Sequence, residues 1–215
     1  DIPSTKKEID TIENILSEHD VSVMKYEGSK GNEEAFKALD KVSPDIIHIA
    51  THGFSVNMLR GSVDNKFLSS VNLYTNKSSG MMWSGLILAG GNNAWKGIKC
   101  AMGVEDGILT AEEISRLNLS NTKLVVLSAC ETGRGDIYID DSVYGLSRAF
   151  NLAGAGTVVM SLWKVRDDVT ALLMARFYSY LMDGKEKHTA LWKAMMDVKA
   201  KYPEPYYWAG FVMQN

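Results

Sequence analysis

The sequence has few of the residues that mark small secreted, disordered or nucleic-acid-binding proteins. Its two cysteines, Cys100 and Cys130, cannot form the several disulfide bridges of a small secreted scaffold, which favours a reducing compartment. Only 4 of its 215 residues are proline and 23% are charged, as in ordinary globular domains. Lysine and arginine number 23 against 26 aspartate and glutamate, so we expect no direct nucleic-acid partner.

Long hydrophobic runs and a signal peptide are also missing. No apolar run reaches the roughly 18 residues that a membrane-spanning helix needs, and the N-terminus lacks the charged, apolar and small-residue regions of a leader. We therefore expect a soluble, cytoplasmic protein without a membrane partner. Residues 1–215 are enough to bury the core of a single domain, and because the chain begins DIPST we interpret it as a fragment of a longer one.

Short apolar runs bounded by polar or glycine-containing segments predict five strands, at residues 21–26, 46–51, 86–89, 124–129 and 157–162. Two of these runs, IIHIAT at 46–51 and LVVLSA at 124–129, are nearly continuous and do not alternate with polar residues. Strands that are covered on both faces have this character. We expect these two strands to be central and parallel.

Helical patterns lie between the predicted strands. TKKE at residues 5–8 and TAEE at residues 110–113 have the form of capping boxes, which begin helices. Later segments repeat apolar residues at helical spacing around Leu146, Leu173 and Leu191, and Gly154 and Gly184 are expected to end two of these helices. The alternation of strands and helices predicts an α/β fold with a mainly parallel sheet and helices on both faces.

Residues 54–85 and 90–106 show neither the helical nor the strand spacing of apolar residues and are predicted to be loops around a site.

Two reactive side chains follow the two central strands directly. Strand 46–51 leads into His52 and Gly53, and strand 124–129 leads into Cys130. Ligands bind beyond the carboxyl ends of parallel strands, so neighbouring strands would bring the imidazole and the thiol into one cleft. A thiol with a pKa near 8.5 is mostly protonated at neutral pH, and a nearby imidazole can take up its proton. The N–H groups of Gly53 and Cys130 are candidate donors to an oxyanion.

The residues alone leave a structural interpretation open. A cysteine at the end of an apolar strand also serves as a small buried hydrophobic residue, and a single histidine also serves a structural role. His48 and His52 have the spacing of a zinc-binding pair on a helix. On a strand, however, residues four apart are separated by about 13 Å, so we expect no metal.

Five motifs occur in a characteristic order: HIATHG at 48–53, LVVLSACETG at 124–133, YGLSRAFNLAGA at 144–155, SLWKV at 161–165 and PYYWAGFV at 205–212. With these motifs the chain resembles the CHAT domain, a caspase-like cysteine protease family related to separase and the caspases. The resemblance covers nearly the whole chain. The family's catalytic histidine falls on His52 and its nucleophile on Cys130, without substitution at either position.

The resemblance implies a caspase-like three-layer α/β/α sandwich with a mainly parallel sheet of about six strands. It implies a cysteine endopeptidase that acts on a protein or peptide substrate and needs no cofactor. CHAT domains commonly follow helical-repeat or other sensor regions, so the resemblance also implies a C-terminal position in a longer chain and control by such a region. The alternative function is an interaction module whose histidine and cysteine are silent or gated.

Substrate specificity is predicted from the residues after Trp163. In separases an acidic residue shortly after the tryptophan receives the basic side chain that precedes the cleaved bond, and Asp167 has the matching offset here. The resemblance thus implies cleavage after Arg or Lys, with Asp168 nearby. In an alternative interpretation, one of the two aspartates caps the following helix. Lys164 and Arg166 could also neutralise these carboxylates or form ion pairs with them. Trp163, for its part, could be a residue of the core.

The segment GRGDIYIDDS at residues 133–142 is predicted to be a loop of the site. Asp136, Asp140 and Asp141 are alternative contributors to the recognition of a basic residue. A solvated acidic turn explains the same three aspartates. Cys100 has no assigned role.

Overall fold

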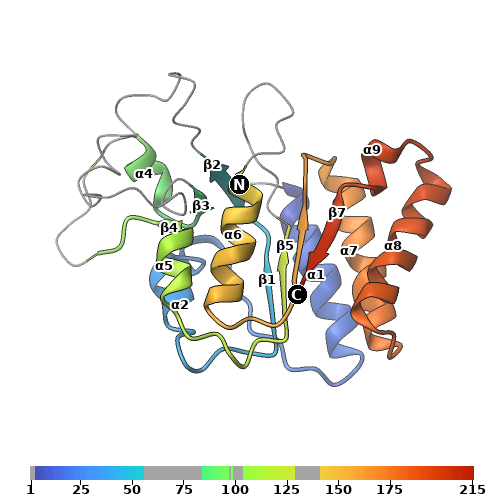
Figure 1. Ribbon diagram of the computed structural model, residues 1–215, viewed down its shortest axis with the longest axis horizontal. Coiled ribbons are helices and arrows are strands. Elements are labelled where there is room, and N and C mark those ends of the chain that lie inside the picture. The colour runs from blue at the N-terminus through green and yellow to red at the C-terminus, as the bar shows by residue number, and fades with distance from the viewer. Residues whose placement is uncertain (1–2, 56–83, 97, 99–103, 129–140) are drawn as a thin grey trace. The chain divides into compact units, whose positions relative to one another are not determined.

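The computed structural model describes residues 3–55, 84–96, 98, 104–128 and 141–215. The chain divides into two compact units. Unit 1 consists of residues 1–25 and 161–213, and unit 2 of residues 26–160 and 214–215. Figure 1 shows the helices and strands that the following paragraphs name.

The parallel strands of unit 2 are β1 (Ile46–Ile49), β5 (Leu124–Leu127) and β6 (Val158–Ser161), in the order β1-β5-β6. All four residues of β5 and of β6 are buried. A strand with apolar side chains on both faces is buried on both faces, because neither face is exposed to solvent. The predicted mixed α/β class, with a mainly parallel sheet and with strands 46–51 and 124–129 as parallel neighbours, is confirmed. The prediction that strand 46–51 is central is wrong: in the described sheet β1 is an edge strand, and only Ile47 and Ile49 of its four residues are buried.

A second, antiparallel sheet in unit 2 was not expected from the sequence. It consists of β2 (His52–Ser55), β3 (Ser84–Ile87) and β4 (Ile108–Thr110), in the order β2-β3-β4. Leu86 and Leu109 lie opposite each other on β3 and β4, and both are fully buried. The predicted loop at residues 54–85 is wrong at both ends, since β2 continues to Ser55 and β3 begins at Ser84, and residues 56–83 lie outside the described residues. The predicted loop at residues 90–106 is wrong in part, because residues 91–95 form a helix.

The helices of unit 2 are η1 (Gly28–Lys30), α2 (Glu33–Lys37), α4 (Gly91–Trp95), α5 (Ala111–Ser115) and α6 (Asp141–Leu152). Helices α5 and α6 pack against each other, and both contact β3 (Figure 1). The predicted capping box at the start of α5 is confirmed: the Thr110 hydroxyl accepts the Glu113 N–H at 3.2 Å, and the Glu113 carboxylate accepts the Thr110 N–H at 2.9 Å. Gly154, with φ +94°, follows the end of α6 as predicted.

Unit 1 contains α1 (Pro3–Ser17), α7 (Asp167–Met182), α8 (Lys187–Lys201), α9 (Pro205–Trp208) and β7 (Phe211–Gln214). Helix α7 packs against both α1 and α8 and buries Val169, Leu173 and Phe177. Gly184, with φ +76°, ends α7 as predicted. Helix α1 begins at Pro3, so the prediction that Thr5 caps it is wrong; proline suits a first helical position because its φ is already helical.

The prediction of a strand at residues 21–26 is also wrong, since no described residue of that segment belongs to a strand. Met24 is 69% exposed and Tyr26 51% exposed, so the alternation of apolar residues there does not create a buried face. None of the described helices combines the length and the apolar character that crossing a bilayer requires.

Candidate active site

The site is built on the pairing of β1 with β5. Ile49 pairs with Leu127, and the Ser128 N–H continues this ladder by donating to the Ile49 carbonyl at 2.9 Å. His52 follows Ile49 by three positions, and Cys130 follows Leu127 by three positions. The two predicted catalytic residues therefore have the same sequence offset from one pair of matched strand residues. Cys130 itself lies outside the described residues.

His52 is the first residue of β2, and its side chain is exposed. It lies opposite Ile87 of β3, whose carbonyl oxygen accepts a hydrogen bond from the Thr51 hydroxyl at 2.6 Å. This bond fixes the backbone just before His52 to the neighbouring strand. His52 is thus an exposed residue on a paired strand rather than in a loop.

Gly53, the predicted oxyanion donor, is buried and lies opposite Leu86. Phe54 follows it and fills the space beside Gly85, where an added Cβ would lie 2.7 Å from the phenyl ring. The strand after His52 is thus held by tight packing. Such a strand suits a backbone donor, since a preorganised donor needs no rearrangement during the reaction.

Trp163, from the predicted substrate-binding group, is half-buried in unit 1. Its indole Nε1–H donates to the Tyr206 carbonyl at 2.8 Å, and its ring stacks on the Tyr206 ring. An added Cβ at Gly210 would lie 2.8 Å from the indole, so the absence of a side chain there makes room for the tryptophan. Helix α9 and Gly210 therefore fix the orientation of this ring.

Asp167 and Asp168 are the first two residues of α7, and both are exposed. The prediction that one of them caps the helix is wrong, because Arg166 occupies the capping position and makes no side-chain capping bond. Carboxylates in a first helical turn still interact favourably with the helix dipole. The predicted substrate-binding aspartates belong to unit 1, whereas His52 belongs to unit 2.

Arg166 pairs with Asp168, as the alternative interpretation of the sequence predicted. Its Nε and one terminal nitrogen donate to the two carboxylate oxygens at 3.0 and 2.6 Å. These hydrogen bonds hold the pKa of Asp168 below its usual value. The guanidinium carbon also lies 5.8 Å from the ring centres of both Tyr202 and Tyr207. The charge of Asp168 is thus compensated within the chain.

The remaining predicted acidic contributors are placed only in part. Asp136 and Asp140 lie outside the described residues, as does Cys100. Asp141 is the first residue of α6. Their predicted roles stay predictions.

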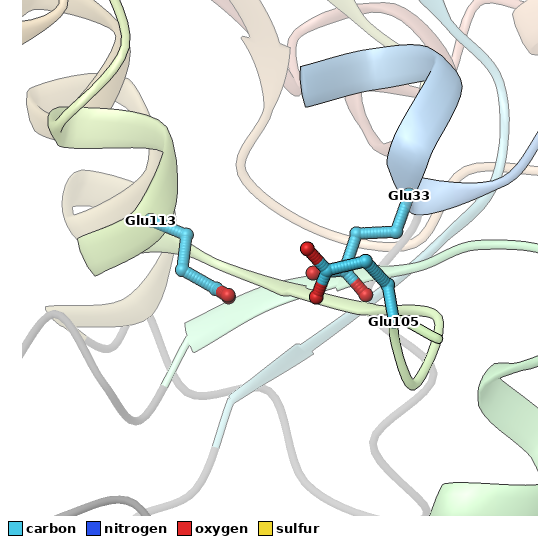
Figure 2. A group of neighbouring side chains, drawn as sticks. All are labelled: Glu33, Glu105 and Glu113. Atoms are coloured by element: carbon cyan, nitrogen blue, oxygen red, sulfur yellow. The ribbon is translucent and has the colours of Figure 1, made fainter. Parts of the chain in front are cut away.

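A cluster of charged side chains, not recognised in the sequence, lies beside the antiparallel sheet (Figure 2). Glu33 begins α2, Glu105 precedes β4, and Glu113 belongs to α5. The Lys37 ammonium lies 2.7 Å from a Glu33 oxygen and 2.9 Å from an oxygen of each of Glu105 and Glu113. We name these four residues the Lys37 cluster. Glu33 and Lys37 are one helical turn apart, which was the one signal for it in the sequence.

The Lys37 cluster shifts the pKa values of its members. Burial raises the pKa of Glu33 to about 7, despite the opposing effect of Lys37. Burial acts in the same direction on Glu113, but hydrogen bonds from Thr110 and Lys37 outweigh it and lower the Glu113 pKa. Burial would lower the pKa of Lys37, yet its three carboxylate partners raise it overall.

The carboxylates of the cluster converge closely enough for one metal ion, with ligand atoms within 4.8 Å of one another. The ammonium group of Lys37, however, already lies within hydrogen-bonding distance of all three. A buried carboxylate needs such a compensating charge. We therefore interpret the cluster as an ion-pair network.

Comparison with known proteins gives a family and two relatives. The CHAT domain family model matches residues 1–215. Tetratricopeptide repeat protein 28 of Mus musculus is 37% identical over 108 residues, which are 49% of this chain and 4% of that protein. Its Homo sapiens counterpart is 35% identical over 112 residues, 51% of this chain and 4% of that protein. The chain thus spans a small part of these relatives, whose name mentions a repeat and no enzymatic activity.

Proposed function

The chain belongs to the CHAT domain family, which is caspase-like, and from this we propose that it is a cysteine endopeptidase in which Cys130 is the nucleophile and His52 its partner base. The observation that carries the proposal is the register of β1 and β5, in which Ile49 pairs with Leu127. Equal three-residue extensions lead from that pair to His52 and Cys130. An accessible imidazole on a fixed strand supports the same role.

The proposed reaction is acyl transfer. The Cys130 thiolate attacks the carbonyl carbon of the scissile peptide bond, and the backbone N–H groups of Gly53 and Cys130 donate to the developing oxyanion. His52, protonated by the thiol, gives its proton to the leaving amine. Water then hydrolyses the thioester and regenerates the free enzyme. No step of this sequence needs a metal or another cofactor.

We propose that the substrate has Arg or Lys before the cleaved bond and that Asp167 receives this side chain. The assignment to Asp167 follows its offset from Trp163, while Asp168 accepts hydrogen bonds from Arg166 through both of its oxygens. Trp163, held by Tyr206 and by the absence of a side chain at Gly210, forms a wall of the substrate site in this proposal.

A matched pair of isosteric changes tests the substrate proposal. Asp167→Asn should lower kcat/KM for Arg and Lys substrates by about tenfold to hundredfold, since it removes the charge of the acceptor. Asp168→Asn should lower it much less. The measurement is a profile of peptides that vary only at the residue before the cleaved bond. Equal effects of the two changes, or a preference for acidic or apolar residues in the wild type, would contradict the Asp167 assignment.

Control of the protease is proposed from the relatives. Both carry a name that refers to tetratricopeptide repeats, and this chain matches only 4% of their length. We propose that a repeat region of the full protein acts as a sensor that holds or releases this domain. A cytoplasmic location, which keeps the thiol reduced, belongs to the same proposal.

An interaction module with a silent dyad is the second candidate, which the absence of an enzymatic activity in the relatives' name favours. A covalent probe with Arg before a reactive ketone separates the two functions, with intact-protein mass as the readout. Endopeptidase function predicts labelling of the wild type and of Cys100→Ala, and none of Cys130→Ala. Absence of labelling in the chain and in the full-length protein, with and without its partners, would favour the interaction module.

A further inference from the structure

A row of three residues crosses the antiparallel sheet from His52 to its far edge. His52 of β2 lies opposite Ile87 of β3, and Ile87 lies opposite Ile108 of β4. Directly before Ile108 is Gly107, whose N–H donates to a Glu33 carboxylate oxygen at 2.9 Å. The exposed histidine and the buried glutamate therefore lie at the two ends of one path through the sheet.

Hydrogen bonds hold each step of this path. On the side of His52, the Thr51 hydroxyl donates to the Ile87 carbonyl at 2.6 Å. On the side of Glu33, the Leu88 N–H donates to the Gly107 carbonyl at 2.8 Å. A displacement of Gly107 would therefore act on Leu88, which directly follows Ile87, the last residue of β3.

Gly107 lies in a closely packed segment and has a left-handed backbone conformation. Its φ is +78°, and an added Cβ would lie 2.3 Å from the Gly91 nitrogen and 2.7 Å from the Ala89 carbonyl oxygen. Closely packed atoms leave little free volume, so a shift of one group displaces its neighbours. The hydrogen bond from Gly107 to Glu33 thus helps to hold the segment before β4 in place.

Several charges surround the Glu33 carboxylate, which is 1% exposed. From its own helix, Lys37 pairs with it at 2.7 Å, and Glu34 accepts the Glu105 N–H at 3.1 Å. From the segment before β4 come Glu105 and Asp106, and from α5 comes Glu113. The Lys37 ammonium thus pairs with three carboxylates, and Glu34 and Asp106 lie on the same two segments as Glu33 and Glu105.

We propose that Glu33 is a positioning residue for His52: its ionised carboxylate holds Gly107 and, through Ile87, sets the position of the strand that begins with the imidazole. The catalytic meaning of this coupling rests on the proposed function. The coupling itself is a property of the sheet and is measurable without catalysis.

The coupling has a pH dependence in the neutral range. Because burial raises the pKa of Glu33 to about 7, the carboxylate changes its ionisation between pH 6 and pH 8. Protonation replaces the charge-assisted bond to Gly107 with a weaker neutral one. The position of His52 therefore differs between the two pH values.

Nuclear magnetic resonance of the 215-residue chain tests the proposal, with Glu33→Gln as a mimic of the protonated glutamate. The ring-proton signal of His52 should differ between wild type and Glu33→Gln at pH 8 and coincide at pH 5.5. His19 and His188, which lie in unit 1, serve as internal controls and should show no difference at either pH. Glu105→Gln is the matched variant, since it removes a cluster carboxylate that does not bond to Gly107.

Coincident His52 signals at both pH values would overturn the proposal, as would an equal effect of Glu105→Gln. Titration of the wild type covers the case in which Glu33→Gln does not fold. The backbone amide signals of Gly107 and Ile87 should then titrate with one shared midpoint near pH 7, and a silent Ile87 signal would also overturn it. If His52 responds but the covalent probe labels neither the chain nor the full-length protein with its partners, the coupling holds and the proposed endopeptidase function fails.

Discussion

At the scale of single residues, Lys37 compensates the charge of several carboxylates of unit 2. It pairs with Glu33, Glu105 and Glu113, of which Glu33 is fully buried. Lys37→Met keeps the length of the side chain but leaves these carboxylates without their counter-charge. Breaking a buried pair in this way costs about 3 to 5 kcal/mol. We expect a loss of this size in urea-induced unfolding at pH 7.5.

Lys123→Met is the matched control for Lys37→Met. Lys123 pairs with Asp45, but both side chains are largely exposed. Exposed ion pairs contribute little, so a change below about 0.5 kcal/mol is expected. Equal effects of the two substitutions would show that the Lys37 cluster does not stabilise the fold.

The Glu33 carboxyl makes a second prediction at the residue scale, in the pH dependence of stability. Its pKa is raised from 4.5 to about 7 on folding, so the folded state binds the proton more tightly than the unfolded state. The stabilisation is fully present below pH 4.5 and is lost as the pH rises to about 7. Relative to Glu33→Gln, which cannot titrate, the wild type should lose on the order of 3 kcal/mol over this range.

Denaturant unfolding of both proteins between pH 4.5 and pH 8 measures this difference. A constant difference across the range would mean that Glu33 keeps an ordinary pKa in the folded protein. A difference that grows in favour of the wild type at higher pH would reverse the predicted sign.

The sequence predicted some residues of the site better than others. His52 and Cys130 were recognisable because each directly follows an apolar strand within an ordered motif. The Lys37 cluster was not, because Glu33 and Glu113 are 80 positions apart in the sequence and approach each other only in the folded chain, where both pair with Lys37. Contacts of this kind depend on tertiary structure, which local patterns do not encode.

At the scale of elements, the connection between β3 and β4 depends on Gly107. Gly107→Ala should destabilise the chain by more than about 3 kcal/mol, because it combines a left-handed backbone with a clash against the main chain of Gly91 and Ala89. Gly184→Ala is the control, since Gly184 has nearly the same φ, +76°, with open space around it. It should cost only the backbone strain, about 1 to 2 kcal/mol.

Thermal unfolding of the two glycine variants compares these costs. Similar melting temperatures would show that the close packing around Gly107 relaxes easily. The coupling of Glu33 to His52 through this glycine would then lose its physical basis.

The elements that the sequence predicted are those with strong local signals. Strands β1, β5 and β6 are continuous apolar runs, and α5 has a complete capping box. Strand β2 reads HGFS, which lacks both alternation and β-branched residues, and β4 has only three residues. Both form because they pair with β3, whose Leu86 is fully buried. The alternating segment at 21–26 shows the converse, a strand pattern without a partner strand in the described structure.

At the scale of the whole molecule, the proposed functions are divided between the two units. Unit 2 carries His52 and the Lys37 cluster, and unit 1 carries Trp163, Asp167 and Asp168. The predicted catalytic histidine and the predicted substrate-binding residues of the proposed endopeptidase thus belong to different units. A single catalytic domain over residues 1–215 remains part of that proposal.

The central claim is that His52 acts on Cys130, and the pH dependence of Cys130 alkylation tests it most directly. Iodoacetamide rates are measured in a Cys100→Ser background, with His52 present or replaced by Ala, so that neither a substrate nor an activating partner is required. The account predicts that His52→Ala moves the midpoint up toward about 8.5 and slows alkylation at pH 7 by about tenfold or more. Identical pH profiles in the two proteins would contradict it.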